Sequence, residues 1–292
     1  MVEFLQQILS GLATGCVYAL VALGLVLLYK ATEVLSFAHG DLMMLAAFIA
    51  YTIVMVWGGN FVVGLLVAMI VLALLGLVIN RFIIRPMMGR PIFAFVLVTL
   101  GVSLVLRGIV MLVPIWGTDD YRLVTPLDGK VLHLGPFLLN AVSAAVIVIT
   151  GLVMAVFFLF FRYTKLGTAM RATAQNALAA TYVGIDTRRI YAIIWAISAA
   201  AAALAGVLLA PMLFVHVNMG IVGLNALPAA IIGGVASLPG AVVGGILLGV
   251  VEALAGYYLP EGAKEVAPYV MLLVVLAIRP GGIFPEVVAK KV

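Results

Sequence analysis

Charged side chains are scarce in this sequence. Asp, Glu, Lys and Arg make up 9% of its 292 residues, whereas hydrophobic residues make up 66%. Soluble domains carry roughly one quarter charged residues, so this composition argues against a soluble core and predicts a polytopic membrane protein. The net charge of +5 is assigned to loops at the cytoplasmic membrane face rather than to nucleic-acid binding, because no stretch combines aromatic with basic residues.

Cysteine and histidine are almost absent. Cys16, the single cysteine, lies in an apolar run and is predicted to be a small buried hydrophobe, so neither a disulfide framework nor a metal cluster can form. The three histidines, His39, His133 and His216, are far apart and include no His-Glu-x-x-His pair. We therefore expect no metal site and no intramembrane zinc protease.

Sequence motifs of catalysis are missing as well. The chain has no Gly-x-Ser-x-Gly elbow of a serine hydrolase and no Gly-x-x-x-x-Gly-Lys-Ser/Thr loop of an ATP-hydrolysing domain. It also has no polar block long enough to form a separate soluble domain. The sequence thus predicts a membrane subunit that is not an enzyme and binds no cofactor, so any energy conversion must come from a partner.

Apolar runs of about 20 residues, the length that crosses a bilayer as a helix, follow one another along the chain. They predict an all-α protein of eight or nine spanning or half-spanning helices in one transmembrane domain, residues 1–292. No Lys or Arg precedes Lys30, so the first run is expected to be retained rather than cleaved as a signal peptide. The runs lie at 8–30, 36–57, 61–80, 92–113, 137–161, 190–213, 224–236, 240–258 and 266–279.

The basic residues predict an orientation. If the loop 162–189 is cytoplasmic, alternation of the spans places 12 of the 16 Lys and Arg residues inside. This asymmetry satisfies the positive-inside rule, and the opposite orientation would reverse it. We therefore predict an outer N-terminus, a cytoplasmic C-terminus, and two outer loops at 114–136 and 260–268.

The loop 162–189 is the longest polar interruption between two apolar blocks. It carries five basic residues and a single acid, Asp186. Its middle is predicted to form a short helix that Thr168 caps and Gly184 ends. A helix of roughly a dozen residues is too short to cross the hydrocarbon layer, so we expect it to lie outside the membrane and to contact a partner.

A polar turn at 33–41 separates the first two apolar runs. Glu33, His39 and Asp41 lie near membrane depth beside Gly40, which indicates a reverse turn or broken helix that lines or gates a pathway. A hydrated cytoplasmic turn explains the same residues. A proton relay through His39 and Asp41 is the weakest alternative, because residues two apart on a helix do not face each other.

Arg107 is the most isolated charge, since it lies within the fourth apolar run. It could extend toward the membrane interface or pair with an intramembrane acid such as Glu252. We favour one of these structural roles over contact with a substrate.

Glycine and proline divide the apolar stretch 224–260. Gly240 with Gly244, and Gly245 with Gly249, have the GxxxG spacing that lets helix backbones approach closely in lipid. The turn at 237–240 splits the stretch into two shorter helices, which either serve packing alone or expose free backbone groups to a central pathway. The turn at 237–240 weakly resembles the turn at 38–40, which suggests that the chain consists of two related halves.

Three segments together resemble a known family. Residues 171–186 resemble the cytoplasmic loop of ABC-importer permeases, whose Glu-Ala-Ala-x-x-x-Gly signature is matched by Ala179, Ala180 and Gly184, with Leu178 at the Glu position. Residues 35–41 resemble the Asn-Phe-Ala-His-Gly-acid signature of LivH-type branched-chain amino-acid permeases, with Ser36 in place of Asn. Residues 231–245 resemble the second-half signature of the same family. The sequence is similar to this family from end to end.

The resemblance implies a set of partners in a bacterial or archaeal inner membrane. A second related permease chain (LivM-like) and this one would form the pathway, two cytoplasmic ABC ATPases would bind ATP and Mg²⁺, and an extracytoplasmic binding protein would deliver the substrate. The short helix would be the coupling helix that contacts the ATPases. Its implied docking residues are Met170, Arg171, Gln175, Asn176, Leu178, Ala179, Ala180, Tyr182 and Gly184.

The substrate and the pathway are less narrowly defined. The resemblance points to leucine, isoleucine and valine, although related permeases carry other amino acids, amides or urea. Polarity near apolar spans suggests five pathway residues: Ser36, His39, Asp41, Asn218 and Asn225. Two alternatives are an ion-gradient-driven secondary transporter that uses His39, Asp41 or Glu252, and a structural or channel-like membrane subunit.

Overall fold

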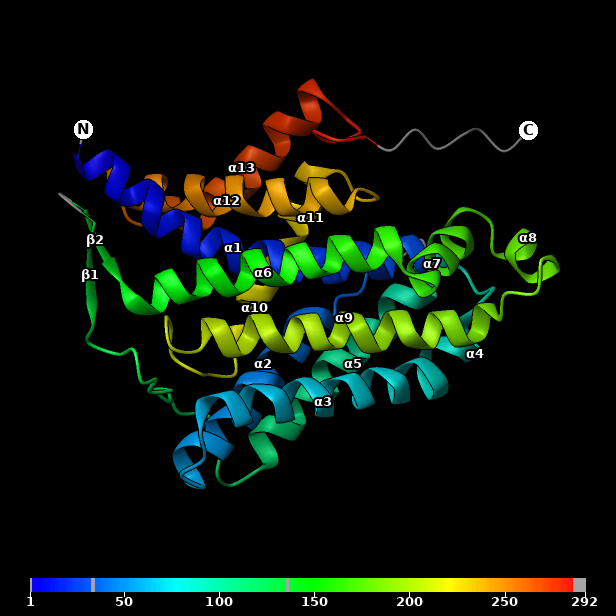
Figure 1. Ribbon diagram of the computed structural model, residues 1–292, viewed down its shortest axis with the longest axis horizontal. Helices are drawn as coiled ribbons and strands as arrows, with labels where there is room; N and C mark the ends of the chain where they lie inside the picture. The colour runs from blue at the N-terminus through cyan, green and yellow to red at the C-terminus, as the bar shows by residue number, and fades with distance from the viewer. Residues whose placement is uncertain (1, 33–34, 135–136, 286–292) are drawn as a thin grey trace.

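The computed structural model describes residues 2–32, 35–134 and 137–285. Glu33 of the predicted turn lies outside the described residues, as do Lys290 and Lys291, two of the 12 basic residues that the predicted orientation places inside. Figure 1 shows the arrangement of the elements. The helices are α1 (Val2–Thr32), α2 (His39–Tyr51), α3 (Phe61–Ile79), α4 (Arg85–Met87), α5 (Ile92–Leu112), α6 (Ala141–Tyr163), α7 (Lys165–Gln175), α8 (Ala177–Tyr182), α9 (Thr187–Leu209), α10 (Met219–Leu224), α11 (Ala226–Gly233), α12 (Leu238–Tyr258) and α13 (Ala263–Ile278).

Seven of these helical segments are long and apolar enough to cross a membrane. Two of them include a π-helical turn, Thr52–Val56 after α2 and Asn80–Ile84 between α3 and α4. The third segment therefore continues to Met87, past the end predicted at 80. The predicted spans at 224–236 and 266–279 correspond to shorter elements, the α10–α11 pair and the 16-residue α13.

The fifth predicted span begins later than expected, because residues before it form strands. Strands β1 (Val131–Leu134) and β2 (Phe137–Asn140) pair antiparallel, and α6 starts only at Ala141. The Gln6 side chain exchanges hydrogen bonds with the backbone of Leu138, and its Oε1 accepts from the Leu138 N–H at 3.1 Å. The hairpin is thus held beside the start of α1, at the opposite end of the bundle from α7 and α8 (Figure 1).

Helix α1 occupies the centre of the bundle. It packs against α12, α9, α11 and α6, and most of its middle is buried. Helices α3, α5 and α6 instead lie at the periphery and expose many large apolar side chains. Such faces are stable where lipid or another membrane chain covers them.

Four glycines of α12 face two different neighbours. A Cβ atom added at Gly249 would overlap the backbone of Gly15 in α1, and one added at Gly245 would overlap Ala19. The corresponding atoms at Gly240 and Gly244 would overlap the backbone of α11. Each GxxxG pair therefore lies where a side chain would separate two helices.

A Gly249→Val change is expected to destabilise the α1–α12 contact. Overpacking typically costs about 1–3 kcal/mol, and here the obstacle is backbone that cannot rotate away. Thermal unfolding of the purified chain in detergent measures the loss. Gly151→Val on α6 is the matched control, because its added Cβ would meet no atom of the described residues within 4 Å. Equal destabilisation by both variants would contradict the packing argument.

Candidate functional site

The basic loop forms two short helices rather than the single one predicted from Thr168 to Gly184. Helix α7 begins earlier, because the Thr164 hydroxyl accepts a hydrogen bond from the Gly167 N–H at 3.0 Å and caps it. Thr168 lies inside α7, where its hydroxyl donates to the Thr164 carbonyl. At Asn176 the backbone becomes extended and the chain turns into α8.

Asn176 explains the break. Its side-chain Oδ1 accepts a hydrogen bond from the Ala179 N–H at 2.9 Å, so this residue caps α8. Asparagine is among the strongest N-cap residues and a poor residue within a helix, which favours a new start over continuation. Gly184 follows α8 with φ of +86°, a left-handed conformation that suits glycine.

The predicted docking residues of this α7–α8 segment (Lys165–Tyr182) divide into two groups. Met170 and Ala180 are buried against the rest of the chain, so the prediction that they contact a partner is corrected. Leu178 and Tyr182 on α8 are 68% and 82% exposed. The other predicted members are also exposed: Arg171, Gln175, Asn176, Ala179 and Gly184.

Sequence reasoning missed Val183, an apolar residue directly after α8 that is 78% exposed. Leu178, Tyr182 and Val183 thus form an apolar surface on a segment outside the membrane-length helices. Exposed large apolar groups gathered on a short polar segment are typical of a protein contact. From the sequence, the exposed face of α8 could have been assigned only if the residue at which α8 starts had been known.

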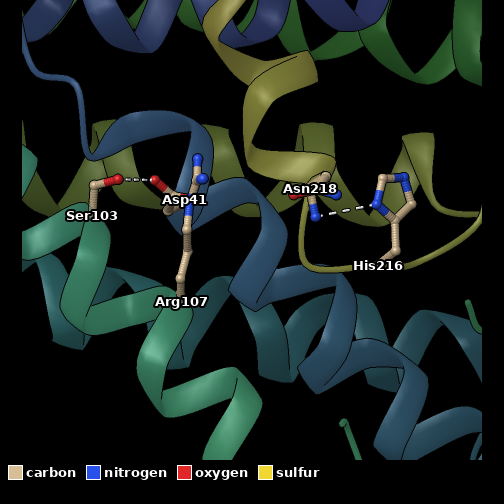
Figure 2. Close-up of polar contacts among 5 residues, drawn as sticks. All are labelled: Asp41, Ser103, Arg107, His216 and Asn218. Carbon is tan, nitrogen blue, oxygen red and sulfur yellow. Dashed lines mark hydrogen bonds and ion pairs between the residues drawn. The ribbon is translucent and has the colours of Figure 1, made fainter. Parts of the chain in front are cut away.

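Asp41 is the centre of a polar cluster inside the bundle, at the start of α2. Its carboxylate is fully buried and accepts a hydrogen bond from the Ser103 hydroxyl. Arg107 Nε lies 2.7 Å from Asp41 Oδ1 and forms an ion pair with it. Figure 2 shows Ser103 and Arg107 reaching Asp41 from successive turns of α5. We call these three residues the Asp41 cluster.

The partner of Arg107 is therefore Asp41 and not Glu252, the acid that the sequence analysis considered. Glu252 instead lies 3.7 Å from Lys264. Ser103 was missed, although a signal exists: Thr99, Ser103 and Arg107 are spaced four residues apart and therefore share one face of α5. Thr99 also contacts the turn, because its hydroxyl accepts a hydrogen bond from the Phe37 N–H at 3.4 Å.

His39 and Ser36 lie buried beside the same turn. Within the described part of the chain, neither the His39 ring nitrogens nor the Ser36 hydroxyl has a hydrogen-bond partner. A Cβ at Gly24 would meet the His39 ring at 2.5 Å, which places this ring against α1. The described contacts thus provide no relay between His39 and Asp41.

The remaining predicted pathway residues lie on and after α10. Asn218 is exposed at the start of α10, and its backbone N–H donates to His216 Nδ1 at 3.1 Å (Figure 2). Gly220, two residues later, packs directly on Asp41. Asn225 lies farther along and accepts a hydrogen bond from the Tyr269 hydroxyl of α13 at 3.3 Å. The structure therefore packs α10, with Asn218 just before it, against the turn that carries Ser36, His39 and Asp41, and Asn225 directly follows α10.

The architecture defines a multi-pass helical membrane protein with polar groups in its interior. A solved structure with a similar fold is described as PsaBC from Streptococcus pneumoniae in complex with Fab, with a TM-score of 0.52 and 15% identity, over 96% of this chain and 93% of that one.

Sequence comparison identifies the family. Residues 7–278 match the family described as branched-chain amino acid transport system / permease component. The high-affinity branched-chain amino acid transport system permease protein LivH of Escherichia coli K12 is 33% identical over 97% of each chain. BraD of Pseudomonas aeruginosa is also 33% identical, over 98% of this chain and 97% of its own length. A probable LivH of Methanocaldococcus jannaschii is 29% identical over 90% of this chain and 87% of its own length.

This chain belongs to the family of branched-chain amino acid transport permease components. The family consists of transport subunits and not of enzymes. Membership confirms the family that the three sequence segments indicated, and it supports the permease interpretation over an ion-gradient-driven secondary transporter.

Proposed function

We propose that this chain is the permease subunit of an ATP-binding-cassette importer and forms part of the pathway for leucine, isoleucine and valine. The observation that carries the proposal is the nearly full-length similarity to permeases named for high-affinity branched-chain amino acid transport. The exposed apolar face of α8 further supports a subunit that is driven by a partner.

The proposed assembly contains four kinds of subunit. A second related permease chain of the LivM type lies beside this one, two cytoplasmic ATPases bind ATP and Mg²⁺, and a soluble extracytoplasmic protein delivers the amino acid. This chain itself binds no cofactor. The excess of Lys and Arg at the α7–α8 end supports a cytoplasmic location for that end, with the N-terminus outside and the C-terminus inside a bacterial or archaeal inner membrane.

In this proposal the α7–α8 segment transmits the motion of the ATPases. Leu178, Ala179, Tyr182 and Val183 provide the contact surface, and the polar residues Arg171, Gln175 and Asn176 lie at its edge with Gly184. The segment lies directly between α6 and α9, to which it is joined by capped turns at Thr164 and Asp186. A displacement of α8 would therefore reach both membrane helices without a long flexible linker.

Reconstitution tests the function. The chain is co-expressed with its second permease chain and ATPases, placed in liposomes, and supplied with the binding protein and labelled leucine. We expect uptake that requires ATP and that unlabelled isoleucine and valine reduce. Uptake driven by a proton or sodium gradient without ATPase subunits would contradict the proposal and support the secondary transporter.

A further inference from the structure

A polar cavity lies between α1, α12 and α13, away from the Asp41 cluster. Its volume is about 300 Å³. It lies at the end of the bundle that carries the β1–β2 hairpin, because the Tyr257 hydroxyl on its wall contacts Glu3 at the start of α1. The polar side chains that line the cavity are Gln7, Ser10, Thr14, Glu252, Tyr257 and Lys264. We call it the Glu252 cavity.

Three polar residues of α1 line the cavity. Gln7, Ser10 and Thr14 are separated by three and four residues, so they lie along one face of a mostly apolar helix. Polar groups within membrane helices usually face protein or a water-filled space, because lipid cannot hydrogen-bond with them. This face of α1 therefore maintains a polar space beside Glu252.

The Glu252 carboxylate can accept a further hydrogen bond. Its side chain is 9% exposed, and its Oε2 atom has no hydrogen-bond partner in the described ranges. The other oxygen, Oε1, lies 3.7 Å from Lys264 Nζ, whereas a charge-assisted hydrogen bond is typically about 2.7–2.9 Å long. A buried carboxylate oxygen without a partner is costly, so a ligand cation at Oε2 would be stabilised there.

Lys264 provides the opposite charge at the same cavity. Its side chain is 60% exposed, so the ammonium group is accessible and only weakly held by Glu252. The cavity thus places a carboxylate with one unpartnered oxygen beside an exposed ammonium group. A ligand that carries one charge of each sign, close together, is the chemical match.

We propose that the Glu252 cavity binds the zwitterionic backbone of a free α-amino acid. The α-ammonium group donates to Glu252 Oε2, and the α-carboxylate accepts from Lys264 Nζ. This inference rests on the proposed function and adds a substrate site to it. The volume is at the small end of ligand pockets, which suits a single amino acid.

The location suits an entry site. The cavity lies at the end opposite α7 and α8, where the proposed orientation places the outer surface. Tyr18 of α1 is a neighbour of both Glu252 and Asn225, so polar groups continue from the cavity to a residue predicted to line the pathway. The remaining wall is Gly249, Ala253 and Gly256, which are too small to select among side chains. The cavity would therefore recognise the amino-acid backbone and leave side-chain selection to the binding protein.

Direct binding to the purified chain is the first test. Saturation-transfer NMR compares leucine with 3-methylbutylamine, which lacks the carboxylate, and 4-methylpentanoate, which lacks the amine. We expect leucine to bind at least about tenfold more tightly than either analogue, because each has lost one charge-assisted contact. Equal binding of leucine and either analogue would overturn the proposal.

Two variants then assign the charges. Glu252→Gln should weaken leucine binding about tenfold or more without weakening 4-methylpentanoate, and Lys264→Gln should weaken leucine without weakening 3-methylbutylamine. Lys130→Gln removes another exposed cation at the same end and should change nothing. If Glu252→Gln fails to fold, the exposed Lys264 still decides the question, and unchanged leucine binding in Lys264→Gln would refute the site.

Transport by the assembled importer separates this inference from the proposed function. Wild-type complexes without ATP-driven leucine uptake would refute the proposed function itself. If the wild type transports, Lys264→Gln should lower uptake about tenfold, while ATP hydrolysis stimulated by the loaded binding protein stays the same. Undiminished uptake by Lys264→Gln in an active system would refute only the Glu252 cavity as a substrate site.

Discussion

An Ala179→Arg variant is expected to fold normally and to lose most of its association with the ATPase subunits. Ala179 is exposed on α8 between Leu178 and Tyr182, and its carbonyl and N–H are already engaged in the helix. A long cation at this position would separate an apolar interface and bury an unpaired charge. That cost is several kcal/mol, so we expect a loss of roughly a hundredfold or more in affinity.

Co-purification of the ATPases with the tagged permease chain measures the effect, and ATP-driven uptake in liposomes confirms its consequence. Ala179→Ser is the matched control, because it keeps a small side chain at the same exposed position and should retain binding and uptake. Thermal unfolding of the isolated chain should be the same for both variants. Full association of ATPases with Ala179→Arg would show that α8 is not the docking element.

An Arg107→Met variant is expected to be strongly destabilised. Among the residues that the structure describes, the change leaves the fully buried Asp41 carboxylate with only the Ser103 hydroxyl as a partner. Removing one member of a buried ion pair typically costs about 3–5 kcal/mol, because the remaining charge stays in a medium of low polarity. The partial exposure of Arg107, 24%, places the expected loss toward the lower value.

Combination with Asp41→Asn separates this effect from simple loss of packing. The double variant Arg107→Met with Asp41→Asn removes both charges, so it should recover much of the stability that Arg107→Met loses. Unfolding in detergent for the wild type, both single variants and the double variant gives the coupling energy. Strictly additive losses would contradict a direct ion pair between the two residues.

Local patterns along the chain predicted much of the fold. All seven membrane-length helices start within about five residues of their predicted positions. Two predictions differ from the structure for local reasons. Strand β2 occupies the first four residues of the predicted fifth span, and Asn176 divides the predicted coupling helix. The N-cap preference of Asn176 was visible in the sequence. It competes with the helix propensity of only a few neighbouring residues, so the sequence favoured neither a break at Asn176 nor a continuous helix.

The cluster and the cavity could not be predicted in this way. Arg107 was expected to extend toward the interface or to pair with an acid such as Glu252, 145 positions downstream, whereas its partner in the structure is Asp41, 66 positions upstream. The choice between them depends on which helix α5 packs against. An apolar helix in a membrane gives little sign of its buried face, since lipid and protein neighbours are both apolar.

The sequence by itself determined the class of the protein, its family and the existence of a short basic segment outside the membrane. These follow from composition and from contiguous motifs, because a bilayer demands long apolar helices whose backbone groups are satisfied internally. Only the tertiary structure decided that Met170 and Ala180 face inward, that Arg107 pairs with Asp41, and that Glu252 and Lys264 share a polar cavity. Each of these depends on contacts between distant helices, which are set by close glycine packing and buried polar groups rather than by any periodicity along the chain.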